Sequence, residues 1–157
     1  MLLQNEAYRM EDIIPLLLEV IASGGEFRLA PRGTSMRPLL REGRDAVALV
    51  APRELKKRDI CLYRRADGSY VLHRLMKFEQ GEPVFCGDNQ TVFERGVLRE
   101  AVIAKASAIY RDEKRVALTN PLYQFYTNMH CIMLWRRWLF LPRRMLAVIK
   151  RKSKKSR

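Results

Sequence analysis

Between residues 26 and 111 the chain carries short apolar runs separated by turn-forming residues, a pattern that restricts the fold more than any other feature. Two runs, DAVALV at 45–50 and DICLY at 59–63, combine β-branched, aromatic and apolar residues, which are enriched in strands. In RRADGSYVLHRLMKF, Asp67-Gly68 separates two more such runs and predicts a β-hairpin. We expect a small barrel or folded sheet with strands over 26–31, 45–51, 59–64, 70–78, 83–86 and 101–110.

Residues 10–23 form the predicted N-terminal helix. Apolar side chains recur on one broad face, and Pro15 falls in the first turns, where proline is tolerated. Gly24-Gly25 ends the pattern. The run IIPLLL is flanked by acidic residues, so we expect neither a signal peptide nor a transmembrane helix here.

The C-terminal part carries most of the net charge of +13. Residues 1–110 contain 17 Lys/Arg against 15 Asp/Glu, whereas residues 111–157 contain 13 against 2. Asn120 can cap a helix that has Pro121 at its first position. WRRWLFLPRRMLAVIK then mixes arginine pairs with aromatic and apolar residues, as interfacial helices do. We expect residues 120–157 to contact an anionic membrane surface or to pack on the protein body, with nucleic acid the less expected partner.

The three cysteines, Cys61, Cys86 and Cys131, include no CxxC pair. An odd number without metal-ligand spacing predicts reduced thiols rather than a disulfide framework or a zinc site. We expect no metal and no cofactor. The chain then divides into an N-terminal helical segment (1–25), a mainly β domain (26–111) and a basic helical extension (112–157).

The string GTSMRPLL contains Ser35 and follows neither a helical nor a strand period. Taken singly, Ser35 is more often a turn hydroxyl, His73 in VLHRL a structural histidine, and Asp88 in FCGDNQ a turn residue. Together, these three residue types can supply a nucleophile, the base that takes its proton, and the acid that orients the base.

In this order, GTSMRPLL, an apolar strand, RDICLYRR, VLHRL and CGDNQ resemble the boxes of the type I signal peptidases, in the subgroup with a histidine general base. The resemblance covers about residues 25–111 and implies a signal peptidase-like catalytic domain of the β-clip or barrel type. It implies Ser35 as the nucleophile, His73 as the general base and Asp88 as the acidic partner. Glu94 stands six residues after Asp88, where the family often has a second acid.

Two further residues can support the site. Backbone N–H groups near Ser35, with Thr34 as a side-chain contributor, can form an oxyanion hole, and Met36 can form part of an apolar wall.

The sequence departs from the family pattern at two places. Arg58-Asp59 stands where the family has a Gly-Asp pair, and residues 10–23 are too short and too charged for the family's usual membrane anchor.

We therefore expect a cytoplasmic serine endopeptidase, peripheral on the inner face of the membrane if its tail binds there. Its substrate would be an extended precursor, leader or signal-like peptide. The alternative is a non-catalytic peptide- or membrane-binding module on the same fold. The related repressor self-cleavage peptidases use a serine–lysine pair, for which Lys77 is available, although a solvated surface lysine is its more ordinary role.

Overall fold

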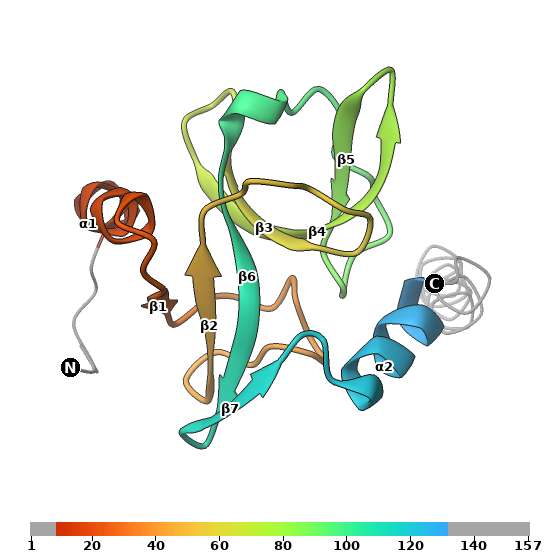
Figure 1. The fold of residues 1–157 in the computed structure, drawn as a ribbon. Helices are drawn as coiled ribbons and strands as arrows, with labels where there is room; N and C mark the ends of the chain where they lie inside the picture. The colour runs from red at the N-terminus through yellow and green to blue at the C-terminus, as the bar shows by residue number, and fades with distance from the viewer. Residues whose placement is uncertain (1–8, 132–157) are drawn as a thin grey trace, which may run out of the picture. The chain divides into compact units, whose positions relative to one another are not determined.

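The computed structural model describes residues 9–131, which belong to two compact units divided in the sequence between Leu118 and Thr119. The first unit contains an antiparallel sheet of seven strands in the order β1-β2-β6-β3-β4-β5, with β7 paired to β6 (Figure 1). The expectation of a mainly β chain is confirmed. The strands are β1 Phe27–Leu29, β2 Asp45–Val50, β3 Ile60–Arg64, β4 Tyr70–Glu79, β5 Glu82–Cys86, β6 Val102–Arg111 and β7 Lys114–Ala117.

Strand β6 organises the sheet because three other strands pair with it. Its stretch 105–111 pairs with β2, and its first residues pair with β3. Its last residues pair with β7. Strands β2 and β3 are almost wholly buried, which explains why their sequences are continuous apolar runs rather than alternating ones.

The β3–β4 hairpin forms where Asp67-Gly68 predicts it. Gly68 adopts φ +86°, a conformation that glycine takes without strain, and Asp67 Oδ1 accepts the Ser69 backbone N–H at 2.9 Å. The turn sets the register of the strands above it, so that Cys61 pairs with His73 and Tyr63 with Val71. This register determines which side chains of β3 and β4 lie on the same face of the sheet.

Strand β7 lies beyond the expected domain boundary at residue 111. Arg111 pairs with Lys114, and the two intervening residues, Asp112 and Glu113, both have positive φ, at 47° and 63°. This is the backbone of a two-residue hairpin that normally carries Asn-Gly, so the charged string RDEKR gave no turn signal. Arg28 on β1 binds Glu113 at 2.7 and 2.8 Å, and the first unit continues to Leu118.

The β3–β4–β5 part of the sheet covers a cluster of buried side chains. Tyr63 and Phe85 stack within it, with ring centroids 4.3 Å apart and an interplanar angle of 16°. Their packing holds the aromatic body of Tyr63 in place, so that only its hydroxyl is left to find polar partners. The other buried members are Cys61, Leu75, Val97 and Val102.

Helix α1, Met10–Ala22, buries one face through Ile13, Ile14, Leu17 and Ile21 and ends before Gly24, where φ is +84°. Its observed bounds agree with the expected helix. Pro15 lies inside it.

The second unit is described only through helix α2, Pro121–Cys131. Asn120 Oδ1 accepts the Leu122 backbone N–H at 2.9 Å, which confirms the expected cap. Leu122, Phe125 and Met129 are exposed. The segments WRRWLFLPRRMLAVIK and RKSKKSR, on which the interfacial-helix expectation rests, lie outside the described residues. Within 9–131, neither helix has the length and apolar character that crossing a bilayer requires.

Candidate active site

Ser35 lies in the long loop that joins β1 to β2. Gly33 opens the loop at φ +85° and donates its N–H to the Glu42 carboxylate at 3.0 Å. The Met36 side chain is buried and anchors the loop, and the Leu40 N–H donates to Met36 O at 2.9 Å. Ser35 is half-buried between these anchors. Among the residues that the structure describes, its hydroxyl and its backbone N–H have no hydrogen-bond partner.

The CGDNQ segment after β5 holds the Ser35 loop in position. Asn89 N–H donates to Ser35 O at 2.7 Å, and the Asn89 side chain donates to Thr34 O at 3.2 Å. Gly87 is required for this approach, because a Cβ at that position would lie 2.7 Å from Ser35 O. The glycine of the CGDNQ segment therefore has a packing reason in this chain.

His73 is buried in β4, and its Nδ1 atom faces two polar groups. Nδ1 lies 3.1 Å from the Tyr63 hydroxyl and 3.4 Å from Glu94 Oε1. No other hydrogen bond of the imidazole occurs in residues 9–131, so Nε2 has no protein partner there.

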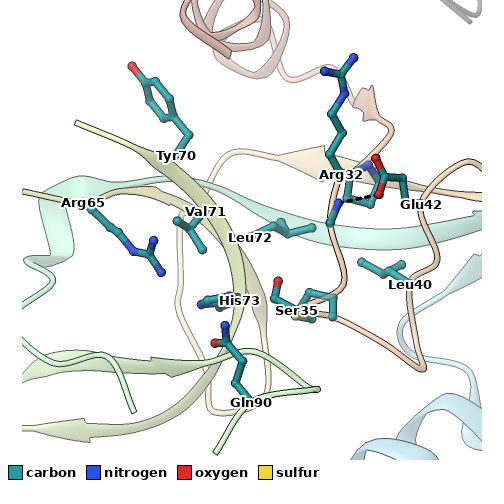
Figure 2. Close-up of a pocket in the computed structure, with 13 residues that line it drawn as sticks. Arg32, Ser35, Leu40, Glu42, Arg65, Tyr70, Val71, Leu72, His73 and Gln90 are labelled. Carbon is teal, nitrogen blue, oxygen red and sulfur yellow. Dashed lines mark hydrogen bonds between the residues drawn. The ribbon is translucent and has the colours of Figure 1, made fainter. Parts of the chain in front are cut away.

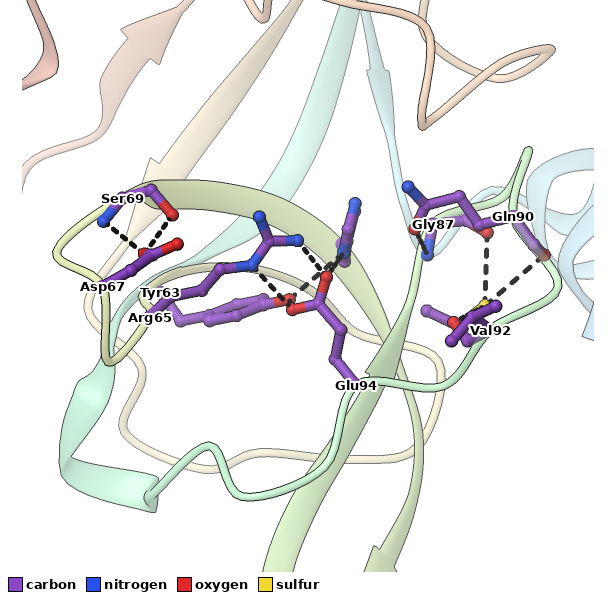
Figure 3. A network of polar contacts seen from close by, with 10 residues as sticks. Tyr63, Arg65, Asp67, Ser69, Gly87, Gln90, Val92 and Glu94 are labelled. Atoms are coloured by element: carbon purple, nitrogen blue, oxygen red, sulfur yellow. Dashed lines mark hydrogen bonds and ion pairs between the residues drawn. The ribbon is translucent and has the colours of Figure 1, made fainter.

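Glu94 is fixed by its backbone and by its carboxylate. Its N–H and C=O both pair with Phe85 of β5, at 2.8 and 3.0 Å. Its carboxylate accepts a 2.5 Å hydrogen bond from the Tyr63 hydroxyl and also binds the Arg65 guanidinium, as Figure 3 shows. Tyr63, His73, Glu94 and Arg65 thus form one connected polar network.

Burial lowers the pKa of His73, and the nearby Glu94 carboxylate opposes that shift only in part. The imidazole is therefore neutral at neutral pH, the form that a general base needs. Partial burial would raise the pKa of Glu94, but hydrogen bonds from Arg65 and Tyr63 outweigh it and lower this pKa. Burial raises the pKa of Tyr63, and the hydrogen bond to Glu94 raises it further, so the phenol keeps its proton.

Asp88 occupies a different environment. Both of its carboxylate oxygens bind Arg74, at 2.8 and 2.7 Å, and both side chains are almost fully buried. Arg74 also donates to Arg58 O at 2.9 Å. The resemblance predicts Asp88 as the acidic partner of His73. In the structure, Asp88 pairs instead with Arg74, the residue that follows His73 in the chain. The carboxylate that lies beside the His73 ring is that of Glu94, whose Oε1 is 3.4 Å from Nδ1.

A pocket of about 270 Å³ is lined by both Ser35 and His73 (Figure 2). They stand 38 positions apart in the sequence, and the fold brings them to one cavity, whose wall also includes Met36. Thr34, Asp88 and Glu94 lie outside the lining. Lys77 is also outside it and pairs with Glu79 at 2.5 Å, so the structure does not bring this lysine to Ser35.

Cys61 and Cys86 are buried, and neither forms a disulfide bond within residues 9–131. In residues 9–131, no group of three His, Cys, Asp or Glu side chains is arranged to hold a metal ion.

Tyr63 and Arg65 are the site residues that sequence reasoning missed. The signal for Tyr63 was present in the hairpin register. Because Cys61 pairs with His73, Tyr63 is two residues along the neighbouring strand and on the same face, which makes it a diagonal neighbour of His73. Arg65 follows at the end of the strand, where it reaches Glu94.

Comparison of the chain with protein-family models and with curated protein sequences finds no match.

Proposed function

We propose that the chain is a serine endopeptidase of the signal peptidase-like type, with Ser35 as nucleophile and His73 as general base. The observation that carries the proposal is the shared pocket: an unpartnered Ser35 hydroxyl and a neutral, buried histidine line one cavity, and the histidine is backed by an ionised carboxylate. A structural histidine would have no need of an adjoining cavity that also contains a serine.

The chemistry follows from these positions. His73 Nε2 takes the Ser35 proton as Ser35 Oγ forms a bond to the scissile carbonyl carbon. The imidazolium then gives this proton to the leaving amine, and the C–N bond breaks. Water attacks the resulting ester and passes a proton to His73, the C–Oγ bond breaks, and the proton returns to Ser35. Glu94 stabilises the transient imidazolium, since its Oε1 lies 3.4 Å from Nδ1.

The backbone around the pocket suits an extended peptide. The Ser35 N–H has no acceptor in residues 9–131, so it can donate to an oxyanion. The side chain of the adjacent Thr34 can contribute a second hydrogen bond. Residues 70–73 of β4 pair with β3 on one side, whereas β5 begins its pairing at Arg74. Residues 70–73 also line the pocket, which supports the addition of a substrate strand along their other edge.

The substrate class we propose is a precursor, leader or signal-like peptide, met in the cytoplasm or at the inner face of the membrane. Exposed Leu122, Phe125 and Met129 on α2, together with the basic sequence that follows, support contact with anionic lipid. Co-sedimentation with anionic liposomes should weaken as salt is added. Binding that ignores lipid charge and survives truncation after Leu118 would contradict this part of the proposal.

The main test compares the N-termini of candidate precursor peptides co-expressed with the wild type and with Ser35→Ala. We expect processed peptides with the wild type and unprocessed peptides with the variant. Ser23→Ala is a matched control, because Ser23 is exposed at the C-terminal end of α1 and its hydroxyl donates a hydrogen bond to Val20 O. Equal processing by wild type and Ser35→Ala would exclude the proposal.

A non-catalytic peptide- or membrane-binding module remains the second candidate. It is favoured by one observation: no hydrogen bond joins the Ser35 hydroxyl to His73 in the described part of the chain. Catalytic hydrogen bonds are often long before substrate binds, so this geometry is also that of a resting enzyme. Unchanged peptide binding without cleavage, for wild type and Ser35→Ala alike, would support the module.

A further inference from the structure

The Tyr63 hydroxyl lies between the two groups that the proposed mechanism connects. It is 2.5 Å from Glu94 Oε2 and 3.1 Å from His73 Nδ1. The phenol ring is fully buried and held by its stack on Phe85, so the hydroxyl has little freedom to turn to other partners. Figure 3 shows Tyr63, Arg65 and Glu94 converging at this point.

The directions of these two hydrogen bonds follow from counting protons. Glu94 is ionised beside Arg65, and an ionised carboxylate only accepts hydrogen bonds. Tyr63 therefore donates its single proton to Glu94, and the short distance fits a bond from a hydroxyl to a carboxylate. The phenol oxygen is then left as an acceptor. A hydrogen bond at 3.1 Å between it and Nδ1 requires that the proton reside on Nδ1.

Glu94 alone does not impose the same constraint. Its Oε1 is 3.4 Å from Nδ1, longer than a charge-assisted hydrogen bond to a carboxylate, which is typically about 2.7–2.9 Å. The Tyr63 oxygen is within the ordinary range, so it is the nearer acceptor. The two imidazole nitrogens share one proton in the neutral ring, and whichever is fixed by a neighbour decides the state of the other.

We propose that Tyr63 is a positioning residue that holds neutral His73 in the Nδ1–H tautomer and leaves the Nε2 lone pair available to Ser35. The carboxylate of Glu94 acts through Tyr63 by taking the phenol proton and turning its oxygen lone pair toward the ring. The catalytic consequence rests on the proposed peptidase activity, whereas the tautomer itself does not. The groups that face the ring are Tyr63 on β3, Arg65 after it, Glu94 after β5, and the more distant Asp88.

The first test is the tautomer of His73 in the intact chain, measured by long-range proton–nitrogen correlation NMR on ¹⁵N-labelled protein above pH 7. His130→Gln identifies the second histidine. We expect a protonated Nδ1 and an unprotonated Nε2 for His73. A protonated Nε2 would overturn the proposal, whether or not the chain cleaves peptides.

The second test is Tyr63→Phe, which keeps the ring that stacks on Phe85 and removes only the hydroxyl. We expect the Nδ1–H population of His73 to fall. Tyr110→Phe is the matched control, because it removes a phenol that contacts Glu26 elsewhere on the sheet, and it should leave the His73 signals unchanged. An unchanged tautomer in Tyr63→Phe would overturn the role of Tyr63, and should that variant not fold, the wild-type measurement decides alone.

Activity separates this inference from the proposed function. With a cleaved peptide in hand, Tyr63→Phe should lower kcat by about 10²-fold, the low end of what general-base assistance contributes, with KM unchanged. Full kcat in Tyr63→Phe beside an inactive Ser35→Ala would refute the positioning role and leave the peptidase intact. Absence of cleavage by the wild type would refute the peptidase and leave the tautomer measurement valid.

Discussion

His73 and Arg74 are neighbours on β4, and they engage two carboxylates that stand six residues apart in sequence. Arg74 binds Asp88 with two hydrogen bonds in a pair sealed from solvent. His73 contacts Glu94, whose side chain keeps 21% of its surface exposed. The Glu94 carboxylate also accepts hydrogen bonds from Tyr63 and Arg65. Successive residues of a strand point to opposite faces, so one short stretch of β4 serves both carboxylates.

The two regions differ in what they can contribute. The Arg74–Asp88 pair is closed, and it joins β4 to the segment whose Asn89 positions Ser35. The Glu94 network borders the pocket and ends on an imidazole that can gain and lose a proton. We therefore expect changes in the first region to alter stability and changes in the second to alter proton transfer.

The largest loss of stability should come from breaking the buried Arg74–Asp88 pair. Arg74→Met leaves the buried Asp88 carboxylate without its main partner, which should lower the free energy of unfolding by about 3–5 kcal/mol. Arg65→Met removes the partner of Glu94 at a site where the arginine is 36% exposed, and should cost about 1 kcal/mol or less. Urea unfolding of both variants measures the difference. Equal losses would erase the distinction between the two regions.

Gly87→Ala tests how the closed region reaches Ser35. The added methyl would meet Ser35 O at 2.7 Å, so the loop must shift, at a cost of about 1–3 kcal/mol in unfolding free energy. We expect peptide cleavage to fall with it. Gly43→Ala is the control, because its Cβ meets no atom within 4 Å and it carries only the strain of φ +76°. Normal cleavage by Gly87→Ala would show that the contact with Ser35 O is not needed.

Glu94→Gln should change the pH dependence of cleavage more than the stability of the fold. The Glu94 charge raises the pKa of His73 against the larger, opposite effect of burial, so its removal should lower that pKa further. The acid limb of kcat/KM reports deprotonation of the base and should move to lower pH. NMR titration of His73 gives the same comparison without substrate. An acid limb displaced to higher pH would contradict the assigned contact.

The same lowered pKa of His73 has a consequence for folding. The unfolded chain binds a proton near pH 6.5, whereas the folded chain binds it only at lower pH, so stability should fall as pH drops below about 6.5. Thermal melts of wild type and His73→Gln across pH 5–8 measure this contribution. The wild type should lose more stability than the variant on acidification, and parallel curves would contradict it.

The smallest effect is expected at Arg58, whose carbonyl supports Arg74. Arg58 has φ +81°, in the left-handed region, where a residue with a side chain is strained. Arg58→Gly removes strain of about 1–2 kcal/mol but loosens the unfolded chain by about 0.4–1 kcal/mol, for a net gain near 1 kcal/mol or below. Arg58→Ala keeps the strain and should gain nothing. A glycine variant that melts no higher than the alanine variant would contradict this.

Much of the fold was accessible from the sequence because its strongest signals are local. Asp67-Gly68 marked the β3–β4 turn, and Asn120 marked the start of α2. The turn before β7 was hidden because Asp112 and Glu113 take positive φ without glycine. The turn also makes a distant contact, the Arg28–Glu113 ion pair, which no local pattern contains.

The site was accessible in part for the same reason. The boxes of the resemblance pointed to Ser35 and His73, which the fold brings to one pocket. The choice between Asp88 and Glu94 depends on how an irregular segment after β5 turns its side chains, and spacing alone does not encode that. Tyr63 was within reach, because the hairpin register places it beside His73, but an aromatic residue in a strand is ordinarily core.

The most direct measurement is the intact mass of the full-length chain, quenched with acid while it cleaves a candidate precursor peptide. We predict an added mass equal to that of the N-terminal fragment of the peptide less one water, located as an ester on Ser35 after digestion, and no adduct on Ser35→Ala. Glu94→Gln should form the adduct more slowly than the wild type. Cleavage by Ser35→Ala at the wild-type rate, or an adduct on another residue, would contradict the account.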